Sequence, residues 1–523
     1  MASKKNHKKN SKQLNLSSKA KYIIGFDWIN LNGLNALVNR NRNTEEARQF
    51  KKEDISKLRY GVLHSRFGYP DGVSIVMEQI ERVLVKNLKV SRNNIFYLVG
   101  QSKNKNRRII EKNVFVDGDS GGLVNSLIKE KFNMGLGGGS SETVENAINE
   151  AKKVITDFVE KKKIDVIIAH NSSHALNLVY AVALSRYYRD CIQKGKKTPK
   201  YILWWHDSHL ERKHFENPSA DINNYLLQGV PGPFVEYIVF INSLQFKQAS
   251  RYFKRLDKRS PGFYNLMELN HDTVYNTTDV FINKFKDLQE EELSNRVEKF
   301  IEDFKIRDLL KKKHQSLNDM LFVLQHTRLV NRKRIDFALA YCYELLSLLK
   351  KKGKYKSLYF FVSGHSADKT RKKLVLLNRK LRKEYNIKNL FLVFGEDYYD
   401  KTDITFEEYP KIFAKLGGIS TYFSEVEGFG NNLLEVLASG LVPIIYTYPV
   451  FKSDIAKYGF KTIALDKFNI DMDKLEETVE VISNKTLRRK WVDYNLKVLK
   501  KHFAHETMAL KLVQAITSKR GHK

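Results

Sequence analysis

The chain has 523 residues, of which 42% are hydrophobic, and its 91 Lys and Arg against 59 Asp and Glu give a formal net charge of +32. This length exceeds one ordinary hydrophobic core and predicts two domains. No apolar run reaches the roughly 18–20 residues of a membrane-spanning helix. The two cysteines, Cys191 and Cys342, exclude a disulfide framework and a cysteine-rich zinc site.

The N-terminal segment is rich in Lys and Asn and has no apolar core, so we expect no secretory signal and a disordered basic tail over residues 1–20. The low cysteine content favours a cytoplasmic location, with peripheral binding at the inner membrane surface as an alternative. The positive charge predicts non-specific attraction to anionic surfaces such as RNA or lipid. Enrichment in Lys and Asn along the whole chain explains the charge equally well.

In the first half, apolar runs alternate with helical stretches, which is typical of a doubly wound α/β domain. Strands are predicted at 60–63, 95–99, 164–169, 201–205 and 237–241, and helices at 75–87, 143–160 and 175–188. After Ser243 the strand pattern stops, and residues from about 285 to 318 are charged and helical.

The strand pattern resumes in the second half, which predicts a second Rossmann-like domain. Its strands are predicted at 321–325, 358–362, 390–394, 419–423 and 442–446, followed by helices at 474–482, 486–500 and 506–516. The predicted organisation is therefore a tail (1–20), an N-terminal Rossmann-like domain (21–285), a charged helical linker (286–318), a C-terminal Rossmann-like domain (319–500) and a final helix with its tail (501–523).

The most informative segment of the second half is Glu427–Glu435, with the sequence EGFGNNLLE. A glycine-rich turn before a helix is a natural phosphate site, because unpaired backbone N–H groups and the positive helix end point to the same place. Glu427 lies on the loop side of this turn, and Glu435 lies about one turn into the helix. Both carboxylates can therefore flank a bound phosphate compound.

A second segment, residues 324–336 (LQHTRLVNRKRID), contains two cations, Arg328 and Lys333. Together the two segments resemble retaining GT-B glycosyltransferases of glycosyltransferase family 4, whose members carry Glu-x7-Glu in this context. The resemblance extends over most of residues 60–515. It implies an α/β GT-B fold with two Rossmann-like domains facing a central cleft, of which the N-terminal one binds the acceptor and the C-terminal one the nucleotide sugar. It also implies a C-terminal helix, here 506–516, that crosses back to the first domain.

The resemblance also implies roles for individual residues. Arg328 and Lys333 match the cations that hold the leaving diphosphate, which suits the charge that develops there. Glu427 would bind the hydroxyls of the donor sugar, and Glu435 those of the ribose. The glycine turn would bind near sugar and phosphate through Gly428, Phe429, Gly430 and Asn431, and Gly364 would border the nucleotide after strand 358–362.

The N-terminal domain contributes two further candidates. Gly72 lies in the loop between strand 60–63 and the next helix, where the resemblance implies contact between the backbone and the donor. His206 follows strand 201–205 and matches a histidine close to the transferred sugar. Because His206, Asp207 and His209 are also potential metal ligands, a metal site stays open from the residues alone. The resemblance implies no metal and no cofactor beyond the donor.

These observations predict a retaining glycosyltransferase that moves a hexose, mannose or glucose, from a nucleotide-diphosphate sugar to an acceptor hydroxyl. GDP-mannose and UDP-glucose are the expected donors, and the expected acceptor is a small polar compound or glycan, with a lipid as the alternative. Two other functions stay open. One is a GT-B sugar phosphorylase, and the other is a basic RNA- or membrane-binding protein with a decayed transferase fold.

Overall fold

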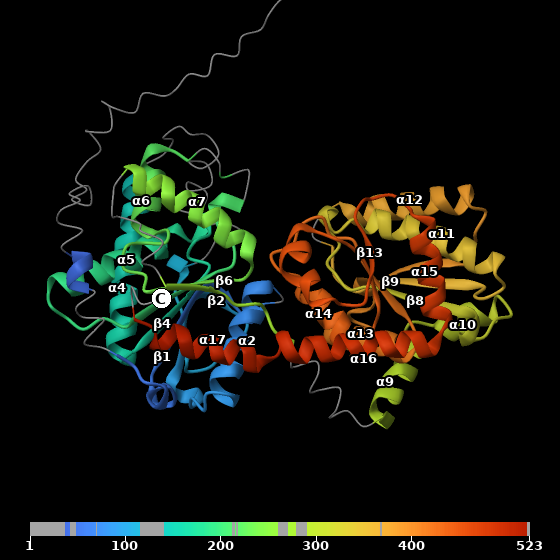
Figure 1. The fold of residues 1–523 in the computed structure, drawn as a ribbon, viewed down its shortest axis with the longest axis horizontal. Helices are drawn as coiled ribbons and strands as arrows, with labels where there is room; N and C mark the ends of the chain where they lie inside the picture. The colour runs from blue at the N-terminus through green and yellow to red at the C-terminus, as the bar shows by residue number, and fades with distance from the viewer. Residues whose placement is uncertain are drawn as a thin grey trace, which may run out of the picture.

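The computed structural model of the chain describes residues 37–41, 49–69, 71–115, 141–211, 215, 218–259, 270–278, 290–366 and 369–519. The predicted basic tail at 1–20 lies outside these residues. The described residues form two α/β units, each built on a parallel sheet (Figure 1). None of the helices that the structure describes combines the length and the apolar character needed to cross a lipid bilayer.

The first unit contains a seven-stranded sheet with the order β3-β2-β1-β4-β5-β6-β7. The chain starts in the middle at β1 and extends the sheet to both sides, which is the doubly wound pattern. The strands are β1 (Tyr60–Phe67), β2 (Ile95–Ser102), β3 (Ile109–Glu111), β4 (Val166–His170), β5 (Lys200–Trp205), β6 (Tyr237–Phe240) and β7 (Asn270–Thr273). The helices are α2 (Gly72–Lys86), α4 (Ser141–Lys162), α5 (Leu178–Gln193), α6 (Ala220–Gly229) and α7 (Ser243–Arg259).

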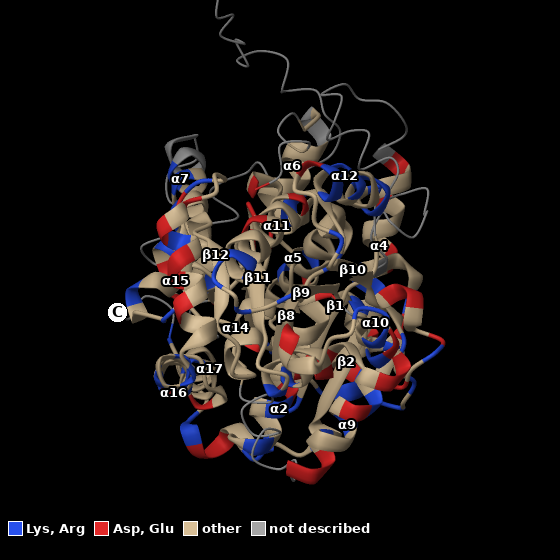
Figure 2. Ribbon diagram, turned by 90° about the vertical axis from the view of Figure 1, so that its right-hand side faces the viewer, with Lys and Arg blue, Asp and Glu red and all other residues tan. Residues whose placement is uncertain are grey.

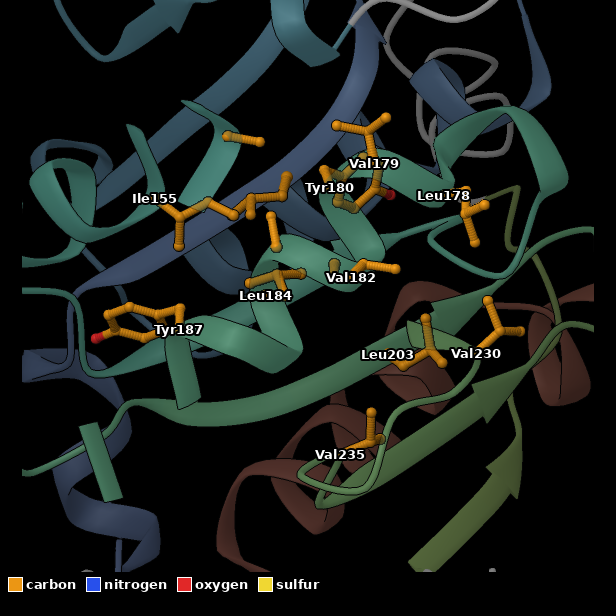
Figure 3. Packing of buried hydrophobic residues seen from close by; sticks show 14 of the residues in the cluster. Ile155, Leu178, Val179, Tyr180, Val182, Leu184, Tyr187, Leu203, Val230 and Val235 are labelled. Carbon is orange, nitrogen blue, oxygen red and sulfur yellow. The ribbon is translucent and has the colours of Figure 1, made fainter. Parts of the chain in front are cut away.

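Helix α5 shows why this sheet is so deeply buried. It is apolar on almost every face, so it lies inside the unit between α4 and α6 rather than on the surface. Val182 and Leu184 of α5 pack in one cluster with Leu203 of β5 (Figure 3). The residues of β5 are all buried, as expected for a central parallel strand.

The second unit contains a six-stranded sheet with the order β10-β9-β8-β11-β12-β13. Its strands are β8 (Met320–Gln325), β9 (Ser357–Val362), β10 (Leu390–Phe394), β11 (Ile419–Tyr422), β12 (Pro443–Tyr446) and β13 (Ile463–Leu465). Its helices are α9 (Glu290–Asp303), α10 (Ile306–Lys311), α11 (Ile335–Lys351), α12 (Thr370–Glu384), α13 (Tyr409–Lys415), α14 (Asn431–Ala438), α15 (Met472–Ser483) and α16 (Lys485–His502). Lys and Arg gather on outer helices such as α12, while the strands carry few charges (Figure 2).

All the predicted strands are present, and their ends agree with the predictions to within a few residues. The expectation that strands stop after Ser243 is wrong, because β7 adds an edge strand at Asn270–Thr273. Its sequence, NHDT, has no apolar alternation and therefore gives no strand signal. Two further edge strands, β3 and β13, have only three residues each and were not predicted.

The region predicted as a charged linker contributes to the core of the second unit. Phe300 of α9 and Phe304, which directly follows this helix, pack against Phe361 of β9, with ring centres 5.7 and 5.3 Å from that of Phe361. The charged residues seen in the sequence lie on the other faces of this helix, which is an ordinary amphipathic arrangement. The domain boundaries themselves stay a prediction.

The last helix, α17 (His505–Thr517), crosses back to the first unit, as predicted. It follows α16 of the second unit and lies beside α2 and the sheet of the first unit (Figure 1). Met508 and Leu512 are buried in one cluster with Val76 and Ile80 of α2. The chain therefore connects its two units twice.

The loops after β6 and β7 contact the glycine turn after β11 and thereby join the two units. The Asn242 side-chain amide donates to Gly428 O at 2.6 Å, and the Asn276 side-chain amide donates to Asn431 Oδ1, also at 2.6 Å. The Phe429 ring stacks on Tyr275, with ring centres 5.2 Å apart. Because all three loops follow the carboxyl ends of their strands, these contacts bring together the two sheet edges at which ligands bind in open α/β folds.

Candidate active site

Glu427 lies at the centre of a buried charge cluster. Lys333 Nζ donates to Glu427 Oε1, Arg332 Nη1 donates to Oε2 at 3.2 Å, and the Tyr422 hydroxyl donates to Oε1 at 3.0 Å. The side chains of Lys333 and Glu427 are only 7% and 9% exposed. The glutamate of the glycine turn and the lysine of the basic loop, which are far apart in the sequence, therefore form one buried ion pair.

The ionisation of this pair follows from its surroundings. Burial raises the pKa of Glu427, but the charges of Lys333 and Arg332 outweigh burial and hold that pKa at about 2. Burial lowers the pKa of Lys333, the charge of Glu427 opposes this effect, and the neighbouring cations Arg332 and Arg328 add to the lowering. Glu427 is therefore a carboxylate at neutral pH, and it can accept hydrogen bonds from sugar hydroxyls.

The N-terminus of α14 is open to an anion. Gly430 precedes the helix with φ at +119°, and an added Cβ would lie 2.2 Å from the Tyr448 hydroxyl oxygen, so only glycine fits. No side chain caps this helix end. The N–H groups of Phe429, Gly430 and Asn431 donate no hydrogen bond to the described residues. Free N–H groups and the positive helix end make this turn suitable for phosphate.

Helix α2, where Gly72 was predicted to contact the donor, differs in this respect. The carboxylate of Asp71 accepts hydrogen bonds from the N–H groups of Val73 and Ser74, both at 3.0 Å. A negative side chain therefore already occupies this helix end. An added Cβ at Gly72 would meet open space, so sterics do not require glycine there. The contact between Gly72 and the donor stays a prediction.

Glu435 lies behind the turn and contacts a histidine that sequence reasoning missed. His326 is fully buried, and its Nε2 lies 3.2 Å from Glu435 Oε2, while its Nδ1 lies 3.0 Å from Ser363 Oγ. The His326 ring stacks on Phe406, with ring centres 4.1 Å apart. His326 thus fixes one oxygen of Glu435, and it positions the carboxylate predicted to bind the ribose.

The second predicted cation, Arg328, has a different environment from Lys333. It is exposed and forms no ion pair within the described part of the chain, although its charge acts on Lys333. Its backbone nitrogen would lie 2.7 Å from a Cβ added at Gly364, so Gly364 allows the loops after β8 and β9 to pack closely. Gly364 therefore has a structural reason to be glycine, and Arg328 is available to a ligand.

His206 lies in a row of buried histidines at the carboxyl edge of the first sheet. Its Nε2 is 2.9 Å from Nδ1 of His170, and His64 Nδ1 is 3.2 Å from His170 O. Burial and the nearby His64 lower the pKa of His206 to about 3, and burial lowers that of His170 well below its usual value. His206 is therefore neutral at physiological pH.

A short polar path connects His206 to the glycine turn. Gln245 Nε2 donates to His206 O at 2.7 Å, and Gln245 N donates to Asn242 Oδ1 at 2.9 Å. Asn242 in turn binds Gly428 O across the contact between the units. The structure therefore brings His206, Glu427, Lys333 and the α14 N-terminus into one region.

The residues weighed as metal ligands do not gather. His206 points to His170, whereas the His209 ring packs edge-on against Tyr252 at 5.3 Å. Among the residues that the structure describes, no group of three His, Cys, Asp or Glu side chains could hold a metal ion. Metal-independent transfer stays a prediction.

Sequence reasoning missed three residues of this region: Arg332, His326 and Asn432. Arg332 lies next to Lys333 in a basic run, and nothing in the sequence distinguishes the two. His326 follows β8 directly, and that position at a strand end was its available signal. Asn432 Nδ2 donates to His326 O at 2.8 Å, a contact between segments far apart in the chain that no local pattern predicts.

Comparisons with known proteins bear on the fold and on the enzyme class. No protein-family model matches the chain. A mannosylglucosylglycerate synthase from Petrotoga mobilis is 26% identical over 421 residues, which cover 78% of this chain and 86% of the relative. A protein of the same name from Thermotoga maritima is 24% identical over 485 residues, 86% of this chain and 98% of the relative.

A solved structure described as trehalose-6-phosphate from E. coli bound with UDP-2-fluoro glucose matches the fold with a TM-score of 0.57. It is 10% identical and covers 88% of this chain and 99% of that one. The fold is GT-B. The named relatives, together with this fold, support glycosyltransferase as the enzyme class of the chain.

The ion pair predicts an asymmetric response to substitution. Glu427→Gln leaves buried Lys333 beside two arginines, whereas Lys333→Met leaves Glu427 with Arg332 and Tyr422. Both should lower the free energy of unfolding, Glu427→Gln more, by about 3 kcal/mol or more, because it leaves a buried cation uncompensated. The double variant should recover part of this loss. Denaturant unfolding of the three variants checks this.

The exposed pair Lys196–Glu160, 3.1 Å apart with side chains 57% and 56% exposed, is the matched control. Lys196→Met should leave stability unchanged, because exposed pairs contribute little. Additive effects of Lys333→Met and Glu427→Gln, with no recovery in the double variant, would contradict the ion pair.

The buried histidines predict a loss of stability on the acid side. The pKa of His206 is about 3 in the folded chain against an ordinary 6.5, so between these values the unfolded chain binds a proton that the folded chain does not. Its contribution is full above pH 6.5 and falls as the pH drops, by at most about 1.4 kcal/mol per pH unit. His206→Asn should make the fall in unfolding free energy between pH 7 and 5 shallower, as measured by denaturant unfolding.

His365→Asn, at an exposed histidine, is the control and should leave the slope unchanged. An equal slope in the native chain and in His206→Asn would show that His206 is not held neutral in the fold.

Proposed function

We propose that the chain transfers a hexose from a nucleotide-diphosphate sugar to an acceptor hydroxyl with retention of anomeric configuration. The observation that carries the proposal is the uncapped N-terminus of α14 beside the Lys333–Glu427 pair. The helix end and Lys333 suit a diphosphate, and the ionised Glu427 suits the hydroxyls of the attached sugar.

The names of the two relatives narrow the substrates to test. Both are mannosylglucosylglycerate synthases, so the product named contains mannose, glucose and glycerate. We infer mannosyl transfer from GDP-mannose to a glucoside of glycerate as the first reaction to test. UDP-glucose is the other donor that the sequence favours. A small polar acceptor of this kind is preferred over a lipid.

In the reaction, the bond between the anomeric carbon and the diphosphate oxygen breaks, and the acceptor oxygen bonds to that carbon on the same face. The proton of the acceptor hydroxyl passes to a phosphate oxygen of the leaving diphosphate. Arg328, Lys333 and the N–H groups of the α14 turn balance the charge that builds up on the diphosphate. Because these groups supply positive charge, we infer that transfer needs no metal ion.

His206 acts as a neutral group in this proposal. Its Nε2 is engaged with His170, and its Nδ1 forms no hydrogen bond with the described residues, so Nδ1 can bind the donor sugar. A neutral imidazole adds no repulsion to the positive charge that develops on the sugar ring. Glu427 and Glu435 fix the sugar and the ribose, so the acceptor meets the anomeric carbon in one orientation.

Ligand binding tests the proposal. Thermal unfolding with GDP, UDP, GDP-mannose and UDP-glucose should show stabilisation by one nucleotide and its sugar, reaching about 2.7 kcal/mol at a ligand concentration of 100 Kd. Arg328→Met should weaken this binding about tenfold, because it removes a charge-assisted hydrogen bond to the diphosphate. Lys372→Met, at an exposed cation of α12, is the matched control and should change nothing.

Product analysis with the stabilising donor then separates the alternatives. Transfer to the acceptor that disappears in Glu427→Ala and Lys333→Ala supports the proposal. Formation of a sugar phosphate from a glycoside and inorganic phosphate would instead indicate a phosphorylase. Salt-sensitive RNA binding with no response to any nucleotide would sink the transferase proposal in favour of a decayed fold.

A further inference from the structure

Two cations that share one aromatic ring lie at the carboxyl edge of the first sheet, apart from the charge cluster around Glu427. Arg66 lies near the end of β1, Tyr69 lies in the loop after β1, and Lys103 directly follows β2. The guanidinium carbon of Arg66 is 5.9 Å from the centre of the Tyr69 ring, and Lys103 Nζ is 5.3 Å from the same centre. Both positive side chains therefore contact the same ring.

The backbone of the two loops holds this arrangement in place. The N–H of Lys103 donates to Phe67 O at 3.2 Å, and the Phe67 ring stacks on Tyr97 with ring centres 4.3 Å apart. Gly68 has φ at +73°, and the side chain of Asn104 occupies the space that a Cβ would need. The backbone that carries both cations is therefore held in place before any ligand binds, which favours affinity.

The acidic groups of these loops already have donors. Glu111 on β3 accepts from Lys105 and from the N–H of Ser102, and Asp71 accepts from the start of α2. Lys103 is exposed and forms no ion pair with any residue that the structure describes. A carboxylate can accept charge-assisted hydrogen bonds from a guanidinium and from an ammonium group.

Arg66 and Lys103 lie at a suitable distance from the region around His206 in which the sugar transfer is proposed. β1, which carries Arg66, is two steps in the sheet from β5, which leads to His206, and β2, which leads to Lys103, is three steps away. At about 4.8 Å per step these separations are about 10 and about 14 Å. Arg66 lies two residues beyond His64, so both side chains belong to the same face of the sheet. A sugar ring whose hydroxyl meets the donor near His206 can therefore reach Arg66 and Lys103 with a short acidic group.

We propose that Arg66, Lys103 and Tyr69 form a subsite that binds the carboxylate of the acceptor, a hexoside of a small hydroxy acid. The inference rests on the proposed function, which supplies the sugar acceptor. Because of this subsite, the chain binds the acceptor that carries the acid group more tightly than a neutral glycoside. The charge-assisted hydrogen bonds of the guanidinium and the ammonium group supply the discrimination.

Calorimetry with two acceptors tests the subsite. The α-glucoside of glycerate carries the carboxylate, and the α-glucoside of glycerol replaces it with a hydroxymethyl group. The native chain should bind the acid about ten- to hundredfold more tightly. Lys103→Gln and Arg66→Gln should each remove about tenfold or more of the affinity for the acid and leave that for the neutral glucoside unchanged. Arg66→Lys, which keeps the charge, should retain most of the preference.

Lys105→Gln is the matched control, because Lys105 lies in the same loop, is 73% exposed at its side chain and pairs with Glu111. It should leave the preference unchanged. Equal binding of both glucosides by the native chain, or an equal loss of both in the Lys103 and Arg66 variants, would overturn the subsite.

Binding is measured without a donor, so the result does not depend on transfer. Preference for the acid without any transfer from a nucleotide sugar would overturn the proposed function and leave the subsite standing. Transfer with no preference for the acid would overturn the subsite and leave the proposed function standing.

Discussion

The buried pair of Lys333 and Glu427 is the interaction on which the candidate site depends. Two charges that are less than a tenth exposed are costly to bury unless each neutralises the other. Their pairing fixes the loop after β8 against the turn after β11, and it leaves a carboxylate whose ionisation is assured by Lys333 and Arg332. The pair also holds the turn that precedes α14, and with it the position of the open N-terminus of this helix.

The second constraint is the contact between the two units. Asn242 and Asn276 bind backbone and side-chain groups of the glycine turn, and α17 returns to pack on α2. The second unit thereby provides cations and free N–H groups, while the first provides neutral histidines and a pair of cations farther along its edge. This division matches a reaction in which one side binds a charged leaving group and the other binds a sugar acceptor.

The sequence predicted the central strands well because each is a continuous apolar run flanked by turns, as in Leu321–Gln325 and Leu358–Val362. It missed β7, whose residues Asn270–Thr273 pair through their backbone and show no apolar pattern. At the site, the glycine turn and its two glutamates were recognisable locally. The roles of His326, Arg332 and Asp71 were not, because they depend on contacts across loops and on a cap that only the folded chain shows.

A structure of the chain with a bound nucleoside diphosphate tests the central claim most directly. The account predicts that the terminal phosphate accepts hydrogen bonds from the N–H groups of Gly430 and Asn431, and that Lys333 Nζ and the Arg328 guanidinium approach it within hydrogen-bonding distance. A diphosphate bound elsewhere, for example at the start of α2 beside Asp71, with the α14 turn unoccupied, would contradict it.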